Sequence, residues 1–123
     1  MNRRQRTGRS GERLARAFLL AKGWRIIEAN WRCRAGEIDL IAEDGGMLVF
    51  VEVRTRTGFG IACGTPLESV DERKRRQVRR LAAVYLSTRG AHGRDVRFDV
   101  VAVRMRGTPA DETAEIEHIP NAF

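Results

Sequence analysis

The sequence GEIDLIAEDGGMLVFVEVR, residues 36–54, decides the fold of this chain. Two apolar runs flank a turn at residues 44–46, which is the pattern of a β-hairpin. Each run contains one carboxylate that its apolar neighbours do not explain, Asp39 in the first and Glu52 in the second. A lone carboxylate in a buried strand is costly unless a positive group compensates it. The hairpin therefore predicts both a sheet and a site for a cation.

The pairing of the two strands depends on the length of their turn. A two-residue glycine turn places Asp39 opposite Glu52, whereas a four-residue loop makes them diagonal neighbours. In either register the backbones at these two residues lie about 4.5–8 Å apart. Strict alternation puts Glu37 on the same face as Asp39, and Ile38 and Leu40 together on the other.

Facing carboxylates destabilise a sheet unless a divalent cation bridges them. Oxygen ligands without histidine favour Mg²⁺ or Mn²⁺, and such an ion can activate water against a phosphodiester. The alternative is a solvated outer face. Glu37 would then pair with Arg54 across the two-residue turn, and this surface ion pair would add little stability. Glu12 is a candidate third acid, with an ordinary first-turn glutamate, favoured by the helix dipole, as its alternative.

Helical spacing outside the hairpin predicts a first helix over residues 10–22, with Ser10 as N-cap and Gly23 as the stop. Residues 1–7 read as a loose basic arm, and a strand follows at 24–31.

A second helix is predicted over residues 67–88 and a strand over 96–105, with a weakly structured tail over 107–123 that has a short strand at 116–119. This order predicts one α/β domain over residues 1–123, with a mixed central sheet flanked by helices.

The net charge of +7 comes almost entirely from arginine, since lysine occurs only at Lys22 and Lys74. Arginine favours bidentate phosphate contacts, so nucleic acid is the leading partner. The alternative cause of this arginine excess is a proteome in which arginine is common in every protein. No segment reaches the roughly 20 apolar residues of a membrane span, so no membrane partner is expected. The isolated Cys33 and Cys63 indicate free thiols in the cytoplasm.

The second helix carries a basic face that predicts salt-sensitive binding to a nucleic-acid backbone, with a solvated surface as the alternative. Its candidate contact residues are Arg73, Lys74, Arg76 and Arg80. Asp99 interrupts the last long strand, where we expect it to pair with a helix arginine. Nothing in the pattern marks His92 or His118 as a ligand.

Asp39, twelve intervening residues and then Glu52-Val53-Arg54 resemble the PD-(D/E)-x-K nuclease signature. The segments NWR, GEIDLIA, LVFVEVR, TPLESVDERKRRQ and RFDVVAV resemble the YraN family, also called UPF0102, over about residues 8–103. This resemblance implies a restriction-endonuclease-like fold with an αβββαβ core. It also implies kinship with archaeal Holliday-junction resolvases, and hence the possibility of a homodimer.

The resemblance implies catalytic roles for Glu12, Asp39, Glu52 and Arg54. It makes the three acids metal ligands, together with the backbone carbonyl of Val53. Arginine at position 54 replaces the usual lysine and stays protonated, so its part in proton transfer is in question.

Lys74 is a candidate substitute for that lysine, with a solvated phosphate-binding residue as the alternative. Ile38 stands where the signature often has proline, a minor departure.

The expected function is metal-dependent hydrolysis of phosphodiester bonds in DNA, rather than RNA, with branched DNA a candidate substrate. The alternatives are a non-catalytic nucleic-acid-binding protein on the same fold and a protein that meets an acidic partner.

Overall fold

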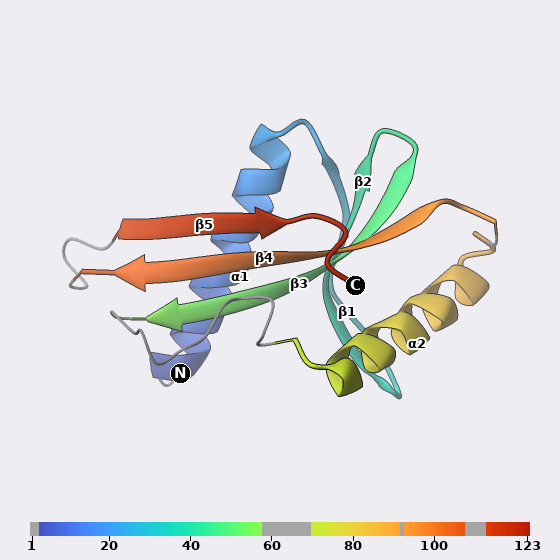
Figure 1. The fold of residues 1–123 in the computed structure, drawn as a ribbon, viewed down its shortest axis with the longest axis horizontal. Coiled ribbons are helices and arrows are strands. Elements are labelled where there is room, and N and C mark those ends of the chain that lie inside the picture. The colour runs from blue at the N-terminus through green and yellow to red at the C-terminus, as the bar shows by residue number, and fades with distance from the viewer. Residues whose placement is uncertain (1–2, 58–69, 92, 108–112) are drawn as a thin grey trace.

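The computed structural model describes residues 3–57, 70–91, 93–107 and 113–123, and side chains from residue 10 onward. One five-stranded mixed sheet has a helix packed on each face (Figure 1), which confirms the predicted α/β class. The elements are α1 (Arg3–Ala21), β1 (Arg25–Cys33), β2 (Gly36–Asp44), β3 (Met47–Thr57), α2 (Glu72–Thr88), β4 (Val96–Arg106) and β5 (Thr113–Ile119). Within these ranges, neither helix combines the length and apolarity needed to cross a membrane.

The strands lie in the sheet in their sequence order, β1-β2-β3-β4-β5. The β3–β4 pair is parallel, and the other three pairs are antiparallel. Parallel neighbours need a crossover connection, and the segment between β3 and β4 contains α2.

The first helix begins at Arg3, so the basic arm expected over residues 1–7 is helical from that point. Ser10 consequently lies inside the helix and is not its N-cap, because the arginines and glutamine before it are good helix formers. The predicted stop at Gly23 is confirmed, with a positive φ of 89°. The N–H of Gly23 donates to the carbonyl of Leu20 at 2.9 Å, and that of Trp24 donates to Leu19 at 3.2 Å. These two bonds form a Schellman motif.

The second helix begins at Glu72, not at residue 67, because Asp71 caps it. Asp71 is extended, and its side chain accepts a hydrogen bond from the Lys74 N–H at 2.9 Å. Residues 67–69 of the predicted helix lie outside the described ranges. The helix packs on the sheet through Val78, Leu81, Ala82 and Tyr85.

Of the two turn lengths that the sequence left open, the hairpin has the two-residue turn, since Asp44 pairs with Met47 across it. The β2–β3 ladder then ends at the pair of Leu40 with Val51, while β2 stays paired with β1 as far as Gly36. Leu40 packs in the core beneath α1, whereas Ile38 packs in the core beneath α2. The expectation that they share a face is therefore wrong, and the change occurs where β2 leaves β3.

Gly11 of α1 is buried against the Thr55 side chain of β3. A methyl group at position 11 would overlap the Thr55 side chain. Ala15 and Leu19, further along the helix, are fully buried over the same face.

The tail holds a longer strand than predicted, because β5 begins at Thr113 rather than at Ile116. The N–H of Ala122 also donates to the carbonyl of Phe98 at 2.7 Å, so the end of the chain folds back on β4. An edge strand buries only one row of side chains, which explains its weak apolar pattern.

Asp99 of β4 is fully buried and has three partners. Its oxygens accept hydrogen bonds from Arg97 at 2.9 and 3.0 Å and from the Asn121 N–H at 2.9 Å, and lie 2.7 Å from His118 Nε2. The predicted pairing with a helix arginine is therefore wrong, because Arg97 on the same strand reaches Asp99 first. The Asp99 network ties β5 and the end of the chain to β4.

Candidate metal centre

Asp39 lies where β2 separates from β3. Its Oδ2 accepts a hydrogen bond from the Val53 N–H at 2.8 Å. This N–H lies beyond the last β2–β3 backbone pair, so the carboxylate of Asp39 takes the place of a strand partner. The end of the ladder thus holds Asp39 at a fixed position.

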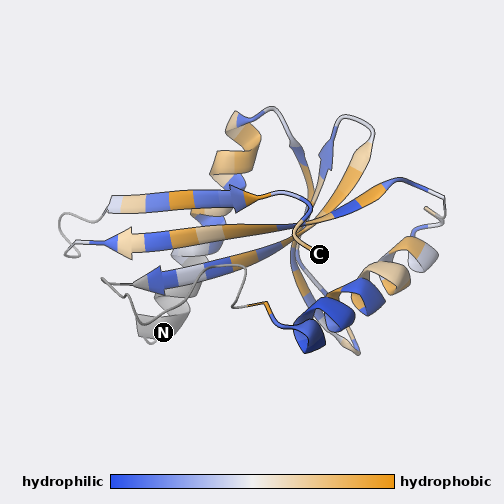
Figure 2. Ribbon diagram, in the orientation of Figure 1, coloured by the Kyte–Doolittle hydropathy of each residue, from blue (hydrophilic) through white to orange (hydrophobic). Residues whose placement is uncertain are grey.

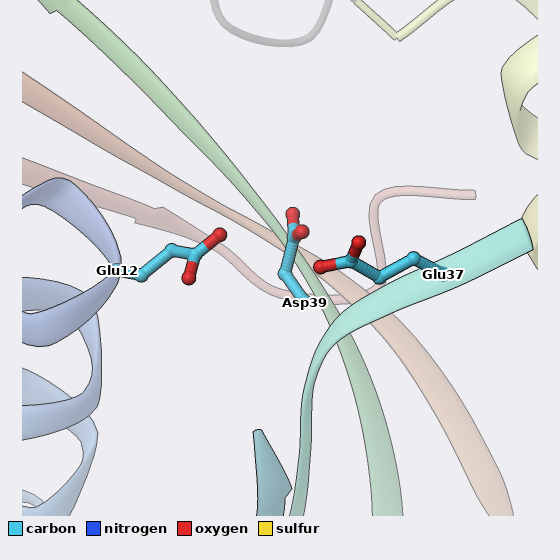
Figure 3. A group of neighbouring side chains, drawn as sticks. All are labelled: Glu12, Glu37 and Asp39. Atoms are coloured by element: carbon cyan, nitrogen blue, oxygen red, sulfur yellow. The ribbon is translucent and has the colours of Figure 1, made fainter. Parts of the chain in front are cut away.

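Three carboxylates converge at this position. Oxygen atoms of Glu12, Glu37 and Asp39 all lie within 4.8 Å of one another. Figure 3 shows Glu12 reaching from α1 and Glu37 from β2, with Asp39 between them. We call this group the carboxylate triangle. Oxygens around one octahedral Mg²⁺ ion are separated by about 3–4 Å, so a small inward movement would suit such an ion.

Glu52 is buried next to the triangle but has cationic partners. Its Oε1 lies 3.4 Å from Lys74 Nζ and 3.6 Å from Arg54 Nη2. Lys74 therefore reaches the site from α2, contrary to the solvated alternative. Glu37 completes the triangle in the place where the sequence analysis expected Glu52.

Burial and repulsion from neighbouring carboxylates raise the pKa values of Asp39 and Glu12. The pKa of Asp39 rises from 3.8 to about 7, first through burial and then through the charge of Glu52. The Val53 hydrogen bond and the charge of Lys74 oppose this pKa shift, and Glu12 adds to it. Burial also raises the pKa of Glu12, against a hydrogen bond from Asn30. Crowded carboxylates with raised pKa values are typical of functional sites, including candidate cation sites.

The raised pKa of Asp39 predicts a pH-dependent stability for the metal-free protein. Between its ordinary value of 3.8 and about 7, the folded chain holds a proton that the unfolded chain has lost. The free energy of unfolding is therefore expected to fall as pH rises through this window. Urea denaturation in EDTA across the window would measure it, with Asp39→Asn as reference. Parallel profiles for the two proteins would contradict the prediction.

The structure brings Glu12 and Asp39 together as predicted and places Glu52 beside them. Sequence reasoning missed Glu37 as a candidate ligand, although its position two residues before Asp39 was a usable signal. Glu37 was expected opposite Arg54. It instead forms an ion pair with Arg32 of β1 at 3.2 Å, because β2 has left β3 there.

The basic residues of α2 divide into two groups. Arg73, Arg76 and Arg80 are exposed, and Figure 2 shows the hydrophilic character of this first half of the helix. Lys74, by contrast, is half-buried against Glu52. The exposed arginines are available to an external anion, and Lys74 belongs to the carboxylate site.

Fold and site together define a mixed α/β protein with a carboxylate cluster between α1 and the point where two strands part. The chain belongs to the uncharacterised protein family UPF0102, whose pattern matches residues 11–103. A UPF0102 protein from Moorella thermoacetica is 51% identical over 120 residues, covering 98% of this chain and 97% of its own. One from Symbiobacterium thermophilum is 54% identical over 99 residues, covering 80% and 82%. One from Rhodococcus jostii is 47% identical over 116 residues, covering 94% of each chain.

Proposed function

We propose that this protein is a metal-dependent nuclease that hydrolyses phosphodiester bonds, in DNA rather than RNA, within the restriction-endonuclease-like group. The observation that carries the proposal is the convergence of Glu12, Glu37 and Asp39 within 4.8 Å of one another. Cys33 is a free thiol, which suits a protein of the cytoplasm.

The proposed cofactor is Mg²⁺ or Mn²⁺, because the triangle offers only carboxylate oxygens. Glu12, Glu37 and Asp39 would hold the ion, with Glu52 and the Val53 carbonyl next to them. When bound, the ion would supply a Lewis acid for the phosphate and a water of lowered pKa.

The cations around Glu52 have a separate role in this proposal. Arg54 stays protonated and holds a phosphate oxygen, since a guanidinium does not release its proton. Lys74 takes the position of the missing lysine, because its ammonium lies 3.4 Å from Glu52 although it comes from α2. It orients the attacking water or the departing oxygen.

Cleavage of labelled linear, forked and four-way-junction DNA, with RNA of the same sequence, tests the proposal. Reactions contain Mg²⁺, Mn²⁺ or EDTA. We expect cleavage of DNA that EDTA abolishes and that Lys74→Met slows by at least about 10-fold. Lys22→Met is the matched control, because the other lysine of the chain lies beside His118, away from Glu52. Absence of cleavage with either metal on every substrate would refute the proposal.

A second candidate is a nucleic-acid-binding protein without catalysis, which the arginine at position 54 favours. It requires salt-sensitive binding that Asp39→Asn leaves unchanged, together with no turnover in either metal. The same set of DNA and RNA substrates therefore separates the two candidates.

A further inference from the structure

A pocket of about 210 Å³ lies on the face of β3, β4 and β5 that is turned away from α1. Val53, Val101 and Val103 point into the core beneath α1, so the residues that alternate with them line the opposite face. Figure 1 shows α2 over the β1–β2 side of the sheet, away from the ends of these three strands. The small side chain of Ala102 forms the floor of the pocket.

Three arginines surround this floor, and two of them face each other directly. Arg56 of β3 and Arg104 of β4 are paired residues of the parallel ladder, and both line the pocket with Arg54. Like charges opposed on neighbouring strands are unfavourable. Within the described parts of the chain, neither Arg56 nor Arg104 has an ion-pair partner.

The carboxylates of β5 do not neutralise this pair. Glu115 is the strand neighbour of Arg104, but its carboxylate lies 3.2 Å from Arg106. Glu117 lines the far side of the pocket, across Ala102 from Arg54. Among the described residues, the half-buried Arg56 and Arg104 therefore have no carboxylate within ion-pair distance.

Arg54 connects this pocket to Glu52, which lies next to the carboxylate triangle. It lines the pocket, and its Nη2 lies 3.6 Å from Glu52 Oε1. Glu52, Arg54 and Arg56 alternate along β3 and so share a face, with about 6.7 Å between successive members. A strand of nucleic acid with one phosphate at the triangle would bring a neighbouring phosphate to the pocket.

We propose that the arginine pocket, formed by Arg54, Arg56 and Arg104 over Ala102, binds a backbone phosphate of the nucleic-acid substrate. The identity of the ligand as nucleic acid rests on the proposed function. The expectation that the ligand is an anion rests on Arg56 and Arg104, which have no ion-pair partner among the described residues. Guanidinium groups bind phosphate through paired hydrogen bonds, and the three cationic residues that line the pocket are all arginines. Glu115 and Glu117 would repel a second phosphate, so the strand leaves the pocket before it reaches β5.

Fluorescence anisotropy with a labelled single-stranded 15-mer in EDTA, which prevents cleavage, tests the pocket. Replacing Arg56 and Arg104 together by glutamine is expected to weaken binding by at least about 10-fold. It should also make the negative slope of log K against log salt concentration shallower by about 1.4, or about 0.7 for each lost contact. Ala102→Leu fills the pocket at unchanged net charge and is expected to weaken binding as well. Arg25→Gln, on the opposite edge strand, is the matched control and should change affinity less than about 3-fold.

The outcomes separate this inference from the proposed nuclease activity. If the double variant and Ala102→Leu bind the 15-mer no more weakly than Arg25→Gln, the pocket is not a substrate subsite, whatever the cleavage assay shows. If the double variant and Ala102→Leu lose binding while the wild-type protein cleaves no substrate, the subsite is supported and the proposed nuclease activity is refuted. Inorganic phosphate and a nucleoside monophosphate serve as competitors. The Arg56 and Arg104 changes could weaken binding of either small anion while leaving the affinity for the 15-mer unchanged. That result would overturn the inference in favour of a free-phosphate site.

Discussion

Asp39→Asn is expected to abolish metal-dependent cleavage, by at least about 100-fold, while the metal-free protein stays folded. The substitution removes a charged ligand from the centre of the carboxylate triangle. Asparagine keeps an oxygen that can accept the Val53 N–H bond, so the local backbone has no reason to move. Initial cleavage rates in Mg²⁺ and in Mn²⁺ measure the loss.

Stability distinguishes this loss from unfolding. Because burial and the charge of Glu52 raise the pKa of Asp39 to about 7, its ionised form is unfavourable at pH 8. Asp39→Asn should therefore raise the Tm in EDTA at that pH, or leave it unchanged. Asp44→Asn, on the same strand but at the turn, is the control and should cleave like the wild type. A lowered Tm, or cleavage at the wild-type rate, would contradict the assignment.

Asp99→Ala is expected to lower the free energy of unfolding by about 3–5 kcal/mol, the usual cost of removing one partner from a buried ion pair. The change removes the closer of the two carboxylate partners of Arg97, with Asp44 remaining at 3.5 Å, and leaves His118 and the Asn121 N–H without the Asp99 carboxylate. Urea denaturation measures the effect.

Asp95→Ala provides the comparison for Asp99. Asp95 precedes β4 by one residue and is exposed, so its loss should cost less than about 0.5 kcal/mol. Similar losses for the two variants would mean that the Asp99 network contributes little to the attachment of β5.

The hairpin and the place of its turn could be predicted because their determinants are local. A glycine pair between two apolar runs indicates the turn but leaves its length open, and the observed two-residue turn sets the register as far as Leu40. The partner of Glu37 could not be predicted in this way. It depends on where β2 leaves β3, which is decided by the packing of two separate cores on the two faces.

The sequence could not decide between the two alternatives for Lys74, nor give the partners of Asp99, for a related reason. Lys74 reaches Glu52 only because the crossover sets α2 against the sheet, at a distance that no periodicity encodes. The Asp99 network depends on His118 in an edge strand whose apolar pattern is weak. Long-range placement decided both contacts, whereas composition and spacing constrained only the local elements.

The contact of Gly11 with Thr55 has a consequence for the choice of cation. Glu12 leaves α1 next to Gly11, where the helix backbone packs directly on the Thr55 side chain of β3. The distance between the helix and Asp39 therefore depends on glycine at position 11, because a methyl group there would overlap the Thr55 side chain. A larger residue at position 11 would change none of the proposed ligands. It would move Glu12 on α1 away from Glu37 and Asp39 on β2. Discrimination by ionic radius, between ions such as Mg²⁺ and the larger Ca²⁺, would thus depend on a residue with no ligand atom of its own.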